Sequence, residues 1–231
     1  MKIIILVACL NLMVLQSFSQ SVNWASLKSD NKHIVHVTTG LDYGLVYGLG
    51  YSHKIKSQMP ILLNVSYSFP SGGQLFDDFK TKIGGQARLY SIGNFQFSAS
   101  IHGIYRRYEN TLVRLQNFGS EMTGVIGYYK PKWFVAGEVG FDKAIVTHFK
   151  HSENFKNDFP NTQDGWYEPS TGGNFHYGIQ TGYSFKNSDL TLTIGNVITQ
   201  DFIITPLIPF YLKLGYNYRI NGRKKLKDNT L

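Results

Sequence analysis

The sequence predicts an all-β protein, a transmembrane antiparallel up-and-down β-barrel of about ten strands. Three observations support this prediction. Apolar and polar residues alternate with period two along most of the chain, as in strands with one apolar and one polar face. Many of these patterns persist for eleven or more residues, whereas soluble strands average about five or six and tilted membrane-spanning strands need about 9–11. Short and long connections also alternate, which is typical of membrane barrels.

The composition is that of one folded β domain. The chain has 231 residues, and domains commonly hold about 100–200. Hydrophobic residues make up 42% and charged residues 16%, which excludes a largely disordered chain. Aromatic residues reach 15% and there are 23 glycines. This combination favours β structure, because aromatic side chains prefer strands and glycine marks turns and bulges.

Residues 1–19 are predicted to be a cleaved secretory signal peptide. Lys2 supplies a positive charge, residues 3–18 are mostly apolar, and Ser17-Phe18-Ser19 places small residues before a cut at Gln20. The alternative is a retained transmembrane helix. The segment is at the short limit for crossing a bilayer, however, and no stop-transfer charges follow it. No apolar run of 18 residues occurs after residue 20, so no helical span is expected.

The single cysteine, Cys9, leaves a second way of processing open. Leu6-Val7-Ala8-Cys9 resembles a lipobox, and cleavage there would make a lipidated Cys9 the first residue. The apolar stretch continues beyond Cys9, which favours the cut after residue 19. The mature chain then contains no cysteine and therefore no disulfide or cysteine metal site.

The barrel is expected to occupy residues 33–220. Ten strands are predicted, near residues 33–40, 43–55, 60–69, 80–91, 95–107, 117–129, 133–147, 173–185, 189–200 and 207–220. The expected short turns are 56–59, 93–94, 131–132 and 186–188, and the long loops are 70–79, 108–116 and 148–172. Short turns face the periplasm in such barrels. Both chain ends then lie in the periplasm, with 20–32 as an N-terminal segment.

The division between the first two strands has an alternative. One parity of apolar residues continues from Val35 to Tyr51, as it would in a single overlong strand. Turn chemistry at Gly40-Leu41-Asp42 favours a break there. If the chain does not turn at this point, residues 20–41 would be a plug or periplasmic extension and the barrel would have eight strands.

Two soluble folds would also show alternation: a lipocalin-like barrel, with its faces reversed, and a β-sandwich. Strand length argues against both. Aromatic residues also lie beside the proposed short turns, as in the girdle of a membrane interface; they are Phe95, Tyr128, Trp133, Phe185 and Tyr218.

Charged residues recur on the face predicted to point into the barrel. They form a proposed lumen charge network of Lys82, Arg88, Arg106, Glu121, Glu138, Asp142, Lys213 and Arg219. The acids lie on the sixth and seventh predicted strands, and the bases mainly on the fourth, fifth and tenth. A small barrel is just wide enough for its side chains to fill it. A plugged lumen held by ion pairs is therefore favoured over a narrow pore with a charged constriction.

The loop 148–172 is the best candidate for binding a partner. Its predicted anchors are Phe155, Phe159, Trp166 and Tyr167. Long loops without regular structure are commonly functional, and exposed aromatic residues are common binding anchors. The alternative is that these aromatic side chains fold back and cap the mouth of the barrel.

Other chemistry has weaker support. His33-x-x-His36 and His148-x-x-His151 suggest metal ligands, but strand residues three apart point to opposite faces, so no metal or other cofactor is expected. His151, Ser152 and Glu153 supply residue types for catalysis without a specific signature, so no catalytic residues are assigned.

The mature chain is basic, and part of its positive charge lies in a C-terminal tail, residues 221–231. Removing residues 1–19 removes Lys2 from a net charge of +8 and leaves +7. Export makes nucleic acid an improbable partner, and a solvated tail is preferred to one that binds anionic lipid or an acidic partner.

Several stretches resemble the small outer-membrane β-barrels of Gram-negative bacteria, and in particular a family of exported barrels with no assigned activity. These stretches are 76–80, 127–133, 136–145, 164–167 and 172–174. The resemblance covers nearly all of the mature chain and implies fold and location without catalytic residues. The predicted function is a non-enzymatic structural or interaction component of the envelope. It would contact outer-membrane lipids and bind an envelope protein. The alternatives are a narrow passive pore and a lipid-modifying enzyme.

Overall fold

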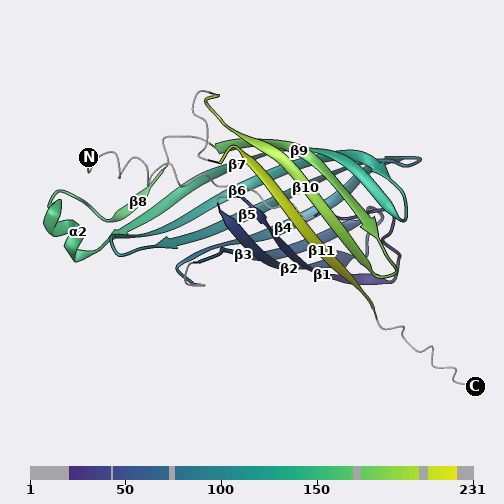
Figure 1. Cartoon of the computed structure of the whole chain (residues 1–231), viewed down its shortest axis with the longest axis horizontal. Helices are drawn as coiled ribbons and strands as arrows, with labels where there is room; N and C mark the ends of the chain where they lie inside the picture. The colour runs from purple at the N-terminus through teal and green to yellow at the C-terminus, as the bar shows by residue number, and fades with distance from the viewer. Residues whose placement is uncertain (1–20, 43, 73–75, 169–172, 203–207, 223–231) are drawn as a thin grey trace, which may run out of the picture.

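A computed structural model describes residues 21–42, 44–72, 76–168, 173–202 and 208–222. These residues form a closed antiparallel barrel of ten strands with a lobe at one end (Figure 1). The barrel strands are β1 (Asn31–Leu41), β2 (Leu45–Ile55), β3 (Ile61–Pro70), β4 (Asp78–Ile92), β5 (Phe95–Glu109), β6 (Val113–Tyr129), β7 (Trp133–His151), β9 (Gly173–Ser184), β10 (Ser188–Thr199) and β11 (Phe210–Asn221). The lobe contains α2 (Glu153–Asp158) and β8 (Gly165–Tyr167). No helix in the described ranges is long and apolar enough to cross a membrane.

Each barrel strand pairs with its neighbours along the chain, and β1 closes the ring by pairing with β11. The strands β7 and β9 are neighbours because β8 projects into the lobe. At Gly40 a β-carbon would lie 2.0 Å from the carbonyl oxygen of Leu212. Glycine at this position therefore allows β1 and β11 to approach closely where the ring closes.

The predicted ten-strand barrel is confirmed, including the break between the first two strands. Leu41 and Leu45 are paired across the β1–β2 hairpin, and the amide of Asp42 donates to the carbonyl of Gly44 at 2.9 Å. The eight-strand alternative is therefore wrong. The apolar parity continues through the break because three residues, an odd number, separate Leu41 from Leu45. Odd-numbered residues therefore face the same side of the barrel in both strands.

The faces of the barrel are arranged for lipid outside and polar packing inside. Outward-facing Leu49 and Met122 are 54% and 63% exposed. Inward-facing Lys82 and Glu121 are almost completely buried. A lipocalin-like barrel would have the opposite arrangement, and a sandwich has no closed ring. Both soluble alternatives are therefore excluded.

The hairpins at the loop end are longer than the sequence indicated. The predicted loop 108–116 is a tight turn, because β5 continues to Glu109 and β6 begins at Val113. The Asn110 side chain accepts hydrogen bonds from the amides of Leu112 and Val113, both at 2.9 Å. The β7 strand likewise continues to His151. Paired strands thus extend past the barrel wall and carry the lobe (Figure 1).

Aromatic belts bracket the apolar outer surface. At the short-turn end, Tyr128 packs against Phe95 and Trp133 with ring centroids 5.2 and 5.7 Å apart, and Tyr218 is also exposed. The sequence analysis did not predict the second belt, which follows the loop end. Its rings are in sequential contact across five barrel strands and β8, in the order Tyr47, Phe69, Tyr67, Phe79, Tyr105, Phe118 and Trp166. Such belts mark the two membrane interfaces.

Some predictions concern residues outside the described ranges. These are the signal peptide over residues 1–19, lipidation at Cys9, and nearly all of the basic tail, residues 223–231. They stay predictions.

Candidate functional site

Buried ion pairs occupy the middle of the barrel interior. Lys82 on β4 and Glu121 on β6 are 2.5 Å apart between nitrogen and oxygen, and their side chains are 2% and 0% exposed. The Thr123 hydroxyl also donates to Glu121 at 3.2 Å. Lys80 lies 3.7 Å from Asp42, and both side chains are fully buried. Because water is excluded, each charge depends on its partner.

Glu138 on β7 is held by neutral donors. The Tyr211 hydroxyl donates to its carboxylate at 2.5 Å, and the Gln180 amide donates to the other oxygen. Lys213 lies over the Tyr211 ring, with its nitrogen 4.4 Å from the ring centroid. Asp142 is hydrogen-bonded to Asn174. The interior thus combines ion pairs with hydrogen bonds between charged and neutral groups.

Ion pairs also lie toward both ends of the interior. At the short-turn end, Arg219 is 3.2 Å from Asp189, and both side chains are 2% exposed. Toward the loop end, Arg106 is 3.5 Å from Asp78. Arg88 is half-buried beside Lys54 and makes no ion pair with a described residue.

Seven of the eight predicted network residues lie in the buried interior. Strand parity gave the direction of these side chains but could not identify their partners. Asp42, Asp78 and Asp189 are partners that the sequence analysis missed, as is Lys80. Lys80 shares its parity with Lys82 on the same strand, so that signal was present. Asp42 lies in a turn, where parity has no meaning.

Residues 21–27 form a plug inside the short-turn end of the barrel. We expected residues 20–32 to form a periplasmic segment. Instead, Val22 and Trp24 are buried in a cluster with barrel residues that include Tyr129 and Phe134. Residues 21–27 show no alternating pattern that would predict their position inside the barrel. Their apolar side chains are buried by packing against the inner wall of the ring.

Hydrogen bonds also hold the plug in place. The Asn23 side chain donates to the Lys130 carbonyl at 2.9 Å and to the Ser184 hydroxyl at 2.8 Å. The Asn217 side chain donates to the Ser21 carbonyl at 2.8 Å. Arg219 donates to the Ser26 carbonyl at 2.7 Å. The plug is therefore joined to three separate parts of the barrel: the β6–β7 turn, β9 and β11.

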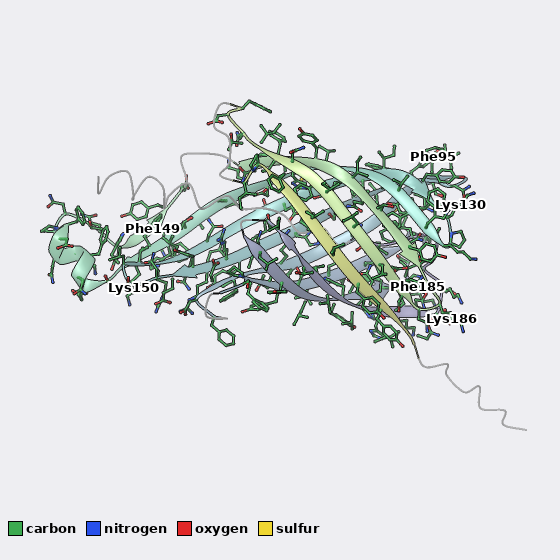
Figure 2. The ribbon with its side chains drawn as sticks, in the orientation of Figure 1. Phe95, Lys130, Phe149, Lys150, Phe185 and Lys186 are labelled. Carbon is green, nitrogen blue, oxygen red and sulfur yellow. The ribbon has the colours of Figure 1, made fainter. Side chains whose placement is uncertain are left out.

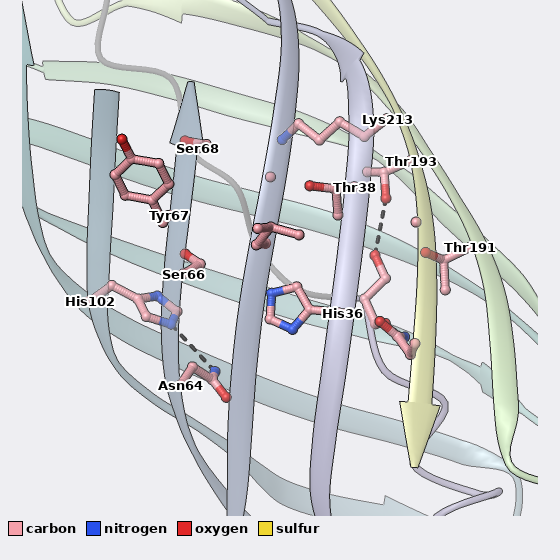
Figure 3. A pocket seen from close by; sticks show the side chains of 15 residues that line it. His36, Thr38, Asn64, Ser66, Tyr67, Ser68, His102, Thr191, Thr193 and Lys213 are labelled. Carbon is pink, nitrogen blue, oxygen red and sulfur yellow. Dashed lines mark hydrogen bonds between the residues drawn. The ribbon is translucent and has the colours of Figure 1, made fainter. Parts of the chain in front are cut away.

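A small polar cavity lies next to the plug (Figure 3). Ser21 of the plug reaches it and is hydrogen-bonded to Thr193 at 3.0 Å. His36, His102 and Lys213 also line it. Its volume is about 40 Å³, which suits a few water molecules rather than an organic solute.

The lobe is tied together by a capped helix and an ion cluster. The Ser152 hydroxyl accepts a hydrogen bond from the Phe155 amide and caps α2. The Asp164 carboxylate lies 2.8 Å from the Lys156 nitrogen and accepts hydrogen bonds from the backbone and ring of His151. The bonds from Lys156 and then His151 hold the pKa of Asp164 well below its usual range. Ser152 and His151 thus have structural partners within the lobe.

The four predicted loop anchors are divided between two faces of the lobe. Phe149 on β7 contacts Tyr167 and His151, His151 contacts Phe155, and Phe155 contacts Phe159. We call these five residues the aromatic row. Because neighbouring strand residues point apart, Trp166 lies on the other face.

Trp166 instead completes the outer aromatic belt. It is 58% exposed and contacts Phe118 and His148. The lobe projects from the barrel end (Figure 1), so its aromatic side chains do not cap the mouth.

The two histidine motifs lie at opposite ends of the barrel. His33 contacts Tyr51 and His53 near the short turns, whereas His148 contacts Trp166 near the lobe. Among the residues that the structure describes, no group of three or more His, Cys, Asp or Glu side chains is arranged to hold a metal ion.

The closed ring, the apolar exterior between two aromatic belts and the polar interior define an outer-membrane β-barrel. No protein-family model matches the sequence, and a search of curated proteins finds no match. Among solved structures, the chain is similar to a KdgM porin, with a TM-score of 0.43 and 11% identity over 81% of this chain and 99% of that chain. A KdgM porin in complex with disordered oligogalacturonate gives a TM-score of 0.42 and the same identity and coverage.

Proposed function

We propose that this protein is a non-enzymatic component of a Gram-negative outer membrane that binds another envelope protein through its lobe. The observation that carries the proposal is the aromatic row on a projecting, internally braced lobe. Phe159 and Tyr167 of this row are exposed. Exposed aromatic residues are typical anchors of protein interfaces.

The construction of the lobe suits recognition by a preorganised surface. The capped helix, the Asp164 cluster and the β7–β8 pairing hold the row in place before a partner arrives. Ordering side chains on binding costs about 0.5–1.5 kcal/mol for each flexible residue. A lobe that is already ordered avoids most of this cost.

A narrow passive pore is the second candidate, and the polar lining of the barrel favours it. Conduction would require movement of the plug, because residues 21–27 occupy the short-turn end, and also rearrangement of the buried ion pairs in the middle of the lumen. Planar-bilayer recordings of the intact protein test this candidate. Steady single-channel currents at neutral pH would support the pore.

Site-specific photocrosslinking in intact cells tests the interaction proposal. A photoreactive phenylalanine analogue is placed at Phe159 in the aromatic row. The matched control places it at Ile126, which is exposed on the lipid-facing side of β6. We expect a discrete protein adduct from position 159 and none from position 126. Absence of a protein adduct at 159, at normal levels of folded barrel, would refute the proposal.

A further inference from the structure

The two ends of the barrel differ in exposed charge. Six exposed lysines gather at the short-turn end, and we call them the basic ring: Lys28, Lys32, Lys56, Lys130, Lys132 and Lys186. Among the described residues at that end, Asp30 is the exposed acid, because Asp189 is buried against Arg219. The lobe, by contrast, exposes four acids, Glu153, Asp158, Asp164 and Glu168.

The cations at the two ends also differ in their partners. None of the basic-ring lysines makes an ion pair with a residue in the described ranges. At the loop end, Arg107 and Arg114 share Glu109, and Lys156 is held by Asp164. The basic ring is thus a set of cations without internal compensation.

The basic ring lies at the depth of a membrane interface. Figure 2 shows Lys130 and Lys186 at the same end as the aromatic residues Phe95 and Phe185, and Lys150 at the other end. The Lys130 nitrogen lies 5.7 Å from the ring centroid of Tyr128 in the belt. Lysine beside interfacial aromatic rings extends its apolar stem along the hydrocarbon boundary and places its charge among the headgroups.

We propose that the basic ring binds the phosphate groups of anionic phospholipids in the leaflet around the short turns. Its lysines come from the segment before β1, the start of β1, and the β2–β3, β6–β7 and β9–β10 turns. These positions are spread around the ring of strands. One protein partner would need a contiguous patch of about 800 Å², whereas surrounding lipids contact every side of a barrel.

Quenching of Trp133 by brominated lipids measures this preference directly. Trp133 is exposed in the same belt and follows Lys132 in the chain. The protein contains three tryptophans. Trp166→Phe removes the one at the loop end, and Trp24 is buried in the plug. The background from Trp24 is measured in a Trp133→Phe/Trp166→Phe variant.

The folded barrel is reconstituted in phosphatidylcholine vesicles containing brominated phosphatidylglycerol or brominated phosphatidylcholine. We expect phosphatidylglycerol to associate about five-fold more strongly, the equilibrium factor for about 1 kcal/mol per basic residue near a membrane surface. Replacing the six basic-ring lysines by glutamine should lower the ratio to about one, and added salt should weaken it. The control Lys143→Gln/Lys150→Gln removes two exposed lysines elsewhere on the outer surface and should leave the ratio unchanged.

A ratio near one for the native barrel would overturn the proposal, as would a ratio that the six-lysine variant leaves unchanged. If that variant fails to fold, Lys130→Gln/Lys132→Gln/Lys186→Gln serves in its place and should lower the ratio partway. Capture of an acidic periplasmic protein by the native barrel, without a lipid preference, would assign the ring to a protein instead. The outcome does not depend on the lobe, so the partner proposal is tested separately.

Discussion

Removing one member of the buried Lys82–Glu121 pair should strongly destabilise the barrel. Lys82→Met leaves the Glu121 carboxylate in the interior without the cation 2.5 Å away. Both side chains are almost fully shielded from water. An uncompensated buried charge of this kind costs about 3–5 kcal/mol.

The same pair distinguishes a packed interior from a water-filled one. Water in the lumen would screen Glu121 and reduce the loss to about 0–1 kcal/mol, the range of an exposed pair. The double variant Lys82→Met/Glu121→Gln removes both charges of the pair. Its stability should return most of the way to that of the native protein.

Urea unfolding of the refolded barrel in detergent, followed by tryptophan fluorescence and heat-modifiable gel migration, measures these losses. The matched control is Arg114→Gln, which breaks a pair with Glu109 whose side chains are 39% and 26% exposed. The control should lose at most about 1 kcal/mol. A loss below about 1 kcal/mol for Lys82→Met as well would refute the packed interior.

Three further predictions concern the plug, the lobe and one turn. Trp24→Ala should lower the free energy of unfolding by about 3–5 kcal/mol, because it removes a buried indole from the plug, and urea unfolding measures this loss. Asp164 has a pKa lowered by Lys156 and His151, so its stabilisation of the lobe is present above the unfolded value of about 3.9 and is lost as the pH falls below it; the protection factors of the α2 amides against hydrogen exchange, corrected for the intrinsic rate at each pH, should fall at low pH, and Asp164→Asn should show the lower protection already at pH 7. Gly93 has a φ of 57° and open space around its β-position, so Gly93→Ala should cost only the left-handed strain of about 1–2 kcal/mol in urea unfolding.

Alternation along the sequence predicted ten strands and the direction of their side chains, but not the full length of the strands at the loop end. Lys82 and Glu121 were assigned to the interior because the side-chain period of a strand is two, and a register error would have moved them to the lipid face. The break between the first two strands was predicted from turn chemistry at Gly40-Leu41-Asp42; in the structure Gly40 and Leu41 belong to β1 and the turn follows Leu41. All of these inferences use residues that are close together in the chain.

The tertiary structure decided which of these residues meet. Lys82 and Glu121 are 39 positions apart and face each other across an intervening strand, a contact that depends on the curvature of the sheet and the stagger of its strands as well as on parity. Trp166 and Tyr167 are adjacent, yet pairing of β8 with β7 directs one to the aromatic belt and the other to the aromatic row. The plug has no repeating pattern, and its position follows from the space that the closed barrel leaves for Val22 and Trp24. Short-range periodicity specifies a strand and its faces, whereas contacts across the lumen exist only after the ring has closed.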